Sequence, residues 1–165
     1  LSFVSVSKNS RAARLGFFYV WKMNIQFATT DEQLLKCRKA VLELRPHIAA
    51  EEYLDKAKLL LDEGAKVIFV DEGNDAPAVA VFRVNYYFHR GKNIYIDDLS
   101  TLPEARGKGY ASALLYFIVS YAKEIGCDNI HLDSGYMKER RDAHRLYLNK
   151  GFYLASHHFV LDLKK

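Results

Sequence analysis

Apolar residues recur along this chain at two spacings, one typical of helices and the other of strands. Helical spacing marks four segments, which are 30–45, 51–63, 107–125 and 139–150. Thr30 and Gln33 form a capping-box pattern at the start of the first segment, and Pro46 ends it. The third segment carries the most continuous apolar face, so it is the most strongly predicted helix.

Strand-favouring residues fill the segments between these helices. They occupy 24–28, 66–71, 78–88, 94–101, 129–133, 152–155 and 159–163. No repeat, low-complexity tract or internal linker interrupts this order, and 165 residues suit one domain with a sizeable core. The order of elements therefore predicts a single mixed α/β domain around one central sheet, with helices packed on it.

The strongest chemical signal lies where the strand at 94–101 leads into the third helix. The sequence there reads Arg106, Gly107, Lys108, Gly109, Tyr110 and Ala111. A helix N-terminus presents N–H groups and the positive end of its dipole, so it attracts phosphate, and glycines let the backbone approach a ligand closely. The pattern is neither a Walker loop nor a dinucleotide fingerprint. A tight turn with solvated basic residues is the alternative interpretation.

These residues resemble a motif of the GNAT superfamily of N-acetyltransferases. The family pattern [QR]-x-x-G-x-[GA] is matched by Arg106, Gly109 and Ala111, and 96–103 is similar to the family's strand before the loop. The C-terminal family pattern A-x-x-[LF]-Y-x-x-x-G-F is matched by 143–152. Two motifs at the right spacing indicate both the fold and the donor.

The resemblance covers 24–163 and implies a GNAT-type α/β fold. Its mixed, mostly antiparallel sheet splays between the fourth and fifth strands, has helices on both faces, and holds acetyl-CoA in the wedge. The Leu99 N–H is implied as the donor of a hydrogen bond to the thioester carbonyl. Many members carry an Asn where Arg140 stands here, so that contact is not carried over. The implied donor-binding residues are Leu99, Ser100, Thr101, Arg106, Gly107, Lys108, Gly109, Tyr110, Ala111 and Ser112.

Acetyl transfer to an amine needs a proton donor for the leaving thiolate, and the resemblance implies Tyr147 for this role. In the family this tyrosine lies near the donor's sulfur. A phenol with a pKa of about 10 is protonated at neutral pH and can donate. The alternative is a core aromatic residue, since Tyr147 shares a helix face with Ala143.

The amine must also lose a proton, and the adjacent acids Asp97 and Asp98 are the candidates for the base. Neighbouring side chains of a regular strand point to opposite faces, so Asp97 should share a face with Leu99. We expect Asp97 to be the base, through a water molecule. Polyamine acetyltransferases have an acid at a similar position. Asp98, His144, water, and a structural role for Asp97 are the alternatives.

The charge of the chain is unevenly distributed. Residues 1–22 contain four basic residues and no acid, so 23–165 hold 20 basic and 20 acidic residues. Nucleic-acid binding requires a basic face on the domain itself, so we expect no nucleic-acid partner. The apolar run at 15–21 is too short to span a bilayer, so we expect no membrane. We interpret 1–22 as a non-domain extension and 23–165 as the acetyltransferase domain, an ordered arm being the alternative.

Cysteine and histidine usage gives no sign of a metal or a disulfide framework. Cys37 and Cys127 are isolated, which is typical of a cytoplasmic protein. His157 and His158 lack an acid or cysteine at ligand spacing, so we expect no metal.

The sequence therefore predicts an enzyme that transfers the acetyl group of acetyl-CoA directly to a primary amine in a ternary complex. A small molecule, a polyamine-like compound and a protein amine all remain candidates for the acceptor. One alternative is a catalytically idle CoA-binding or regulatory module on the same fold. Another is a protein–protein scaffold in which the basic extension is the working part. The resemblance leaves a homodimer open.

Overall fold

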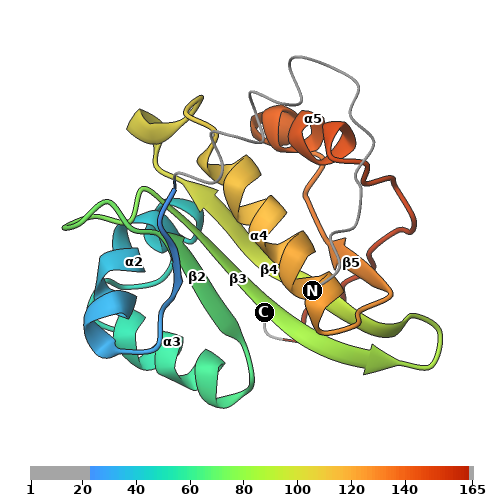
Figure 1. The fold of residues 1–165 in the computed structure, drawn as a ribbon, viewed down its shortest axis with the longest axis horizontal. Helices are drawn as coiled ribbons and strands as arrows, with labels where there is room; N and C mark the ends of the chain where they lie inside the picture. The colour runs from blue at the N-terminus through green and yellow to red at the C-terminus, as the bar shows by residue number, and fades with distance from the viewer. Residues whose placement is uncertain (1–22, 164–165) are drawn as a thin grey trace, which may run out of the picture.

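A computed structural model describes residues 23–163 as one sheet flanked by helices (Figure 1). The strands lie side by side in sequence order: β1 (Ile25–Phe27), β2 (Lys66–Val70), β3 (Ala78–Tyr87), β4 (Gly91–Thr101) and β5 (Asn129–Leu132). The helices are α2 (Asp31–Leu44), α3 (Tyr53–Asp62), α4 (Tyr110–Glu124) and α5 (Arg141–Asn149), with 3-10 turns η1 (Pro103–Ala105) and η2 (Lys138–Arg140). The expected extension at 1–22 lies outside the described residues.

Strand pairing confirms the mixed, mostly antiparallel sheet. β1 to β4 pair in antiparallel fashion, and β5 runs parallel to β4. The β4–β5 ladder begins with Asn93 opposite Asn129 and ends with Ile96 opposite Leu132. β4 itself continues to Thr101, so its residues after Ile96 have no pairing partner on the β5 side. The predicted splay between the fourth and fifth strands is confirmed.

The two faces of the sheet are covered by different helices. On one face, the Tyr121 ring of α4 packs edge-on against Phe82 of β3, with 5.8 Å between ring centroids. Val81 is the neighbour of Phe82 and therefore points to the other face, together with Asp98 opposite it. Arg45 at the end of α2 bonds Asp98, so α2 covers this second face, and α3 packs against α2.

Local sequence signals set the helix starts. Thr30 and Gln33 form the expected capping box, in which the Gln33 N–H donates to Thr30 Oγ1 at 3.3 Å. α4 begins at Tyr110 and not at 107, because Gly107 and Gly109 have φ of 78° and 84°. This left-handed conformation favours glycine and cannot continue into a helix.

The prediction of two C-terminal strands at 152–155 and 159–163 is wrong. Residues 152–163 form neither strand nor helix in the structure. A strand is stabilised by hydrogen bonds to a neighbouring strand, and this segment is not paired to any described strand. Side chains hold it instead: Phe152 packs on Tyr147, and His158 pairs with Asp133 at 2.7 Å. Phe159 remains 90% exposed although its sequence is strand-favouring.

Candidate active site

The junction between β4 and α4 has the backbone geometry of a cradle for phosphate. η1 leads out of β4, and Gly109 is the N-cap residue of α4. The first-turn N–H groups of Ala111 and Ser112 have no acceptor within the helix, as in any α-helix. Because Gly109 has no side chain, no N-cap side chain bonds them either. A Cβ on Gly107 would meet no atom within 4 Å, so the loop is open on that side.

Two side chains of this cradle are engaged elsewhere. Arg106 pairs with Glu43 of α2 at 3.2 Å, so part of its charge is already neutralised. The Tyr110 ring is buried, and its hydroxyl donates to Glu72. The cradle therefore offers mainly backbone N–H groups, with Lys108 exposed beside them.

The end of β4 exposes its backbone toward the splay. The Leu102 N–H donates to the Pro77 carbonyl at 2.9 Å, which makes this a hydrogen-bonded pair of the β3–β4 ladder. Opposite residues of an antiparallel ladder alternate between hydrogen-bonded and non-hydrogen-bonded pairs. Thr101 and Leu99 are therefore non-hydrogen-bonded positions, and their N–H and C=O groups point away from β3. They point to the side where the β5 ladder has ended.

Thr101 adds a polar side-chain atom at this edge. Its Oγ1 is buried and makes no hydrogen bond among the described residues. A buried hydroxyl without a partner is costly, whereas a ligand amide beside it would satisfy it. An extended ligand in which amides are followed by a pyrophosphate, such as acetyl-CoA, has groups that could bond this edge and then the cradle.

A β-bulge lies immediately before Leu99. Phe82 is opposite Ile96 and Val81 is opposite Asp98, so Asp97 is the extra residue in β4. The expectation that Asp97 and Asp98 face opposite sides is therefore wrong, because a bulge turns both residues to the same face. For the same reason Asp97 does not share a face with Leu99.

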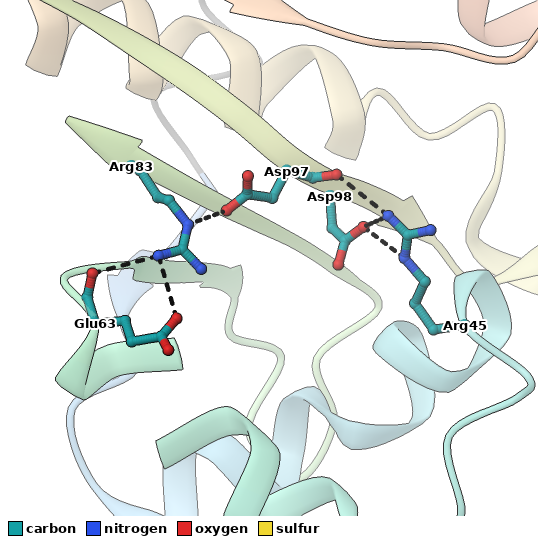
Figure 2. Close-up of polar contacts among 5 residues, drawn as sticks. All are labelled: Arg45, Glu63, Arg83, Asp97 and Asp98. Atoms are coloured by element: carbon teal, nitrogen blue, oxygen red, sulfur yellow. Dashed lines mark hydrogen bonds and ion pairs between the residues drawn. The ribbon is translucent and has the colours of Figure 1, made fainter. Parts of the chain in front are cut away.

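Arginines from two different elements hold these carboxylates (Figure 2). Arg83 Nε of β3 donates to Asp97 Oδ2 at 3.0 Å, and Arg83 Nη1 donates to the Glu63 carbonyl at 3.3 Å. Arg45 Nε and Nη2 donate to Asp98 Oδ1 at 2.9 and 2.5 Å. Burial raises the pKa of Asp97, while the Arg83 charge opposes the shift. Asp97 is thus a half-buried carboxylate that binds a proton more readily than an exposed one.

Tyr147 belongs to α5. Figure 1 shows this helix at the same end of the sheet as the start of α4. Its ring packs edge-on against Phe152 with 5.9 Å between centroids. Burial raises the pKa of its phenol, opposed by Arg140, so the hydroxyl is protonated at neutral pH. The hydroxyl makes no hydrogen bond within residues 23–163, which leaves its proton available to a ligand.

His144 is engaged between α5 and the loop after β5. Its Nε2 lies 3.1 Å from Ser134 Oγ and 2.9 Å from the Gly135 carbonyl oxygen. A ring nitrogen that donates to a carbonyl cannot accept a proton there. The structure thus gives His144 a role in holding the loop.

Several polar residues near the site were not found from the sequence. Arg45 and Arg83 lie far from the acids in the chain, so no local pattern pairs them. Tyr95 was also missed: its hydroxyl donates to Asp133 at 2.5 Å, across the β4–β5 junction. Only the pairing of distant segments brings these side chains together.

The described residues show no sign of a metal centre or a membrane span. Within 23–163, no group of three or more His, Cys, Asp or Glu side chains could hold a metal ion. No helix in the same range is both long enough and apolar enough to cross a bilayer.

Comparison with known proteins identifies the class. The chain belongs to the acetyltransferase (GNAT) family, whose sequence profile matches residues 31–152. This confirms the resemblance seen in the two motifs. Acetyl transfer from an acyl-CoA is the general activity of that family.

Individual relatives agree with this assignment. The uncharacterized N-acetyltransferase YhdJ of Bacillus subtilis (strain 168) is 31% identical over 135 residues, which are 79% of this chain and 92% of YhdJ. A transcriptional regulator from Bacillus halodurans C-125 superposes with a TM-score of 0.74 at 23% identity, covering 86% of this chain and 99% of the other. The aminoglycoside N-acetyltransferase AAC(6')-Iy, solved in complex with CoA, gives 0.73 at 16% identity, covering 87% and 95%. The two solved structures share the fold with this chain.

Proposed function

We propose that this protein transfers the acetyl group of acetyl-CoA directly to a primary amine. The observation that carries the proposal is the continuity of the donor track. The outward-pointing backbone of Leu99 and Thr101 leads through the short turn η1 into the glycine cradle at Gly107 and Gly109. A pantetheine arm would bond the first part, and a pyrophosphate would bond the second.

The proposed chemistry uses three groups: a backbone N–H of this track, a carboxylate of the β4 bulge and a hydroxyl of α5. The Leu99 N–H stabilises the oxyanion that develops on the thioester carbonyl. Asp97, through water, takes a proton from the attacking amine. The new N–C bond replaces the C–S bond, and Tyr147 protonates the thiolate that leaves. One proton is thus removed from the amine and one is supplied to the sulfur, so the reaction is balanced.

The raised pKa values support these roles. A base must be able to bind a proton, and burial makes Asp97 a better proton acceptor than an exposed carboxylate. An acid must hold its proton until the thiolate forms, and burial keeps the Tyr147 phenol protonated. The raised pKa also requires that Tyr147 lies close to the sulfur, because a phenol with a raised pKa is a weak proton donor in water.

The acceptor is an amine whose class the proposal leaves to experiment. Small amines, polyamines, aminoglycosides, amino acids and protein lysines form a suitable panel. The full chain is mixed with acetyl-CoA and each amine, thiol release is followed, and acetylated products are identified by mass spectrometry. Release that depends on both enzyme and amine supports the proposal.

Two negative outcomes are distinguishable. Binding of acetyl-CoA in a calorimeter without release on any amine would indicate the idle CoA-binding module. Absence of binding would indicate a scaffold. Reaction without amine would be hydrolysis, which would contradict direct transfer to an amine.

A further inference from the structure

The side chain of Arg45 contacts both a side chain and a backbone carbonyl of β4. It is the C-cap residue of α2, and its side chain reaches across to the bulge (Figure 2). Its Nε and Nη2 donate to Asp98 Oδ1 at 2.9 and 2.5 Å, and Nη2 also lies 3.5 Å from the Asp97 carbonyl oxygen. Arg45 therefore holds both the side chain after the bulge and the backbone of the bulge itself.

The bulge decides which backbone groups face the splay. The Val81–Asp98 pair is hydrogen-bonded by the alternation described above, so Phe82 and its partner Ile96 are not. Ile96 therefore points its N–H and C=O toward β5, and after the extra residue Leu99 does the same. Without the bulge, the groups of Asp98 would point outward and those of Leu99 would bond β3.

We infer that Arg45 is a positioning residue that stabilises this bulge and thereby aims the Leu99 N–H at the donor's thioester carbonyl. The inference rests on the proposed function for the role of Leu99. The Asp98 side chain is 13% exposed, so its carboxylate needs a partner, and Arg45 is the cation that contacts it. The bulge leaves one carbonyl outside the ladder, and the same guanidinium satisfies it.

The guanidinium shape matters for this role. Two nitrogens of a planar fork contact Asp98 while one of them also reaches Asp97, whereas a lysine ammonium is a single point charge. Arg83 is different although it also pairs with an acid of the bulge. Its side-chain contacts are to the Asp97 carboxylate and to Glu63, and neither is to the backbone of β4.

The variants are Arg45→Met, Arg45→Lys and a control, Lys58→Met. Lys58 pairs with Asp31 at 2.6 Å and is 45% exposed, against 42% for Arg45, but it does not touch β4. Removing an oxyanion donor lowers kcat by about 10²–10³. A donor that is present but points in a poorer direction should retain part of this stabilisation. We expect Arg45→Met to lower kcat by about tenfold or more with little change in the acetyl-CoA Kd. The kcat of Arg45→Lys should lie between those of the wild type and Arg45→Met, and the kcat of Lys58→Met should match the wild type.

A second readout does not depend on turnover. Carbonyl-labelled aspartate with ¹⁵N-leucine leaves signals only from Asp–Leu pairs, which occur at 98–99 and 162–163. In the wild type the Leu99 amide should shift differently with acetyl-CoA and with CoA, because only acetyl-CoA carries the carbonyl. In Arg45→Met this difference should disappear while both ligands still bind. If Arg45→Met does not fold, Arg45→Lys replaces it and should reduce the difference. Asp98→Asn should do the same, with carbonyl-labelled asparagine in place of the labelled aspartate.

The outcomes separate the two proposals. A wild-type Leu99 response to acetyl-CoA without turnover on any amine would sink the proposed function and leave the role of Arg45 standing. Turnover in the wild type with kcat and the Leu99 response unchanged in Arg45→Met would overturn the inference alone. A wild-type Leu99 amide that does not distinguish acetyl-CoA from CoA would also overturn it.

Discussion

Helices α4 and α5 both border the proposed site, but they are held to the fold in different ways. α4 buries side chains along its whole length, which are Tyr110, Ala113, Leu114, Leu115, Ile118 and Ala122. α5 buries none completely, and its main ties are Tyr147 on Phe152 and His144 on the loop after β5. The segment that follows it, 152–163, is mostly exposed.

This difference matches the kind of group that each region contributes. The β4–α4 junction offers backbone N–H groups, whose directions are fixed only if the chain beneath them is rigidly packed. α5 offers one side chain, the Tyr147 hydroxyl, on an element with few buried contacts. In the proposed mechanism, the more buried helix therefore binds the donor, and the less buried helix supplies the proton.

The largest expected effect comes from removing that proton. Tyr147→Phe keeps the ring that packs on Phe152 and loses only the hydroxyl. General acid catalysis typically contributes about 10²–10⁴-fold, so kcat should fall within or just below that range while the acetyl-CoA Kd stays unchanged. Steady-state kinetics and calorimetry measure the two quantities.

A matched control removes a hydroxyl from the other helix. Tyr121→Phe alters a ring of α4 that packs on Phe27 and Phe82, away from the splay. It should retain wild-type kcat. If Tyr147→Phe also retains it while product release is not limiting, Tyr147 is a packing residue.

Asp97→Asn should have a smaller effect with a distinct pH signature. The loss at the pH optimum should be about ten- to a hundredfold, because water retains part of the base function. Burial raises the pKa of Asp97, so the acidic limb of kcat/KM should lie above the pKa of an exposed carboxyl. The variant should lose this limb. A limb that survives at the same pH would assign it to another group.

Hydrogen exchange compares the two helices without any substitution. Amides of α4 should exchange at least about tenfold more slowly than those of α5, because α4 is buried and α5 is not. Peptide-level exchange followed by mass spectrometry would measure this. Equal protection in both helices would contradict the distinction between a rigid and a movable side of the site.

The smallest effect is expected from the N-terminus. A chain that starts at Met23 retains every described helix and strand. It should therefore fold and show unchanged kcat/KM. Loss of folding or turnover on truncation would show that 1–22 belong to the working protein.

The sequence predicted the local structure around the β4–α4 junction well because its signals are local. The capping box at Thr30, the glycines at 107 and 109, and the apolar face of α4 each require only neighbouring residues. Residues with a left-handed backbone and helix N-termini have strong sequence preferences. Element boundaries moved by a few residues without changing their order.

The acidic pair and the C-terminus were not predictable in the same way. The bulge at Asp97 has no glycine or proline to mark it, and it depends on pairing with β3. The cations that neutralise the acids come from positions 45 and 83. The segment 152–163 is strand-favouring in composition, yet strand formation requires a partner that local propensity does not supply. Each of these features depends on contacts between distant parts of the chain.

The central claim is that the β4–α4 junction binds the phosphates of acetyl-CoA through its backbone. Gly109→Asp and Gly109→Asn test it most directly, because both side chains have the same shape and bear similar backbone strain at the left-handed φ of 84° that Gly109 adopts. Only the aspartate places a negative charge where phosphate is expected to bind. Calorimetry should give an acetyl-CoA Kd for Gly109→Asp at least about tenfold weaker than for Gly109→Asn, with both variants folded. Equal Kd values for the two variants, close to that of the wild type, would contradict the claim.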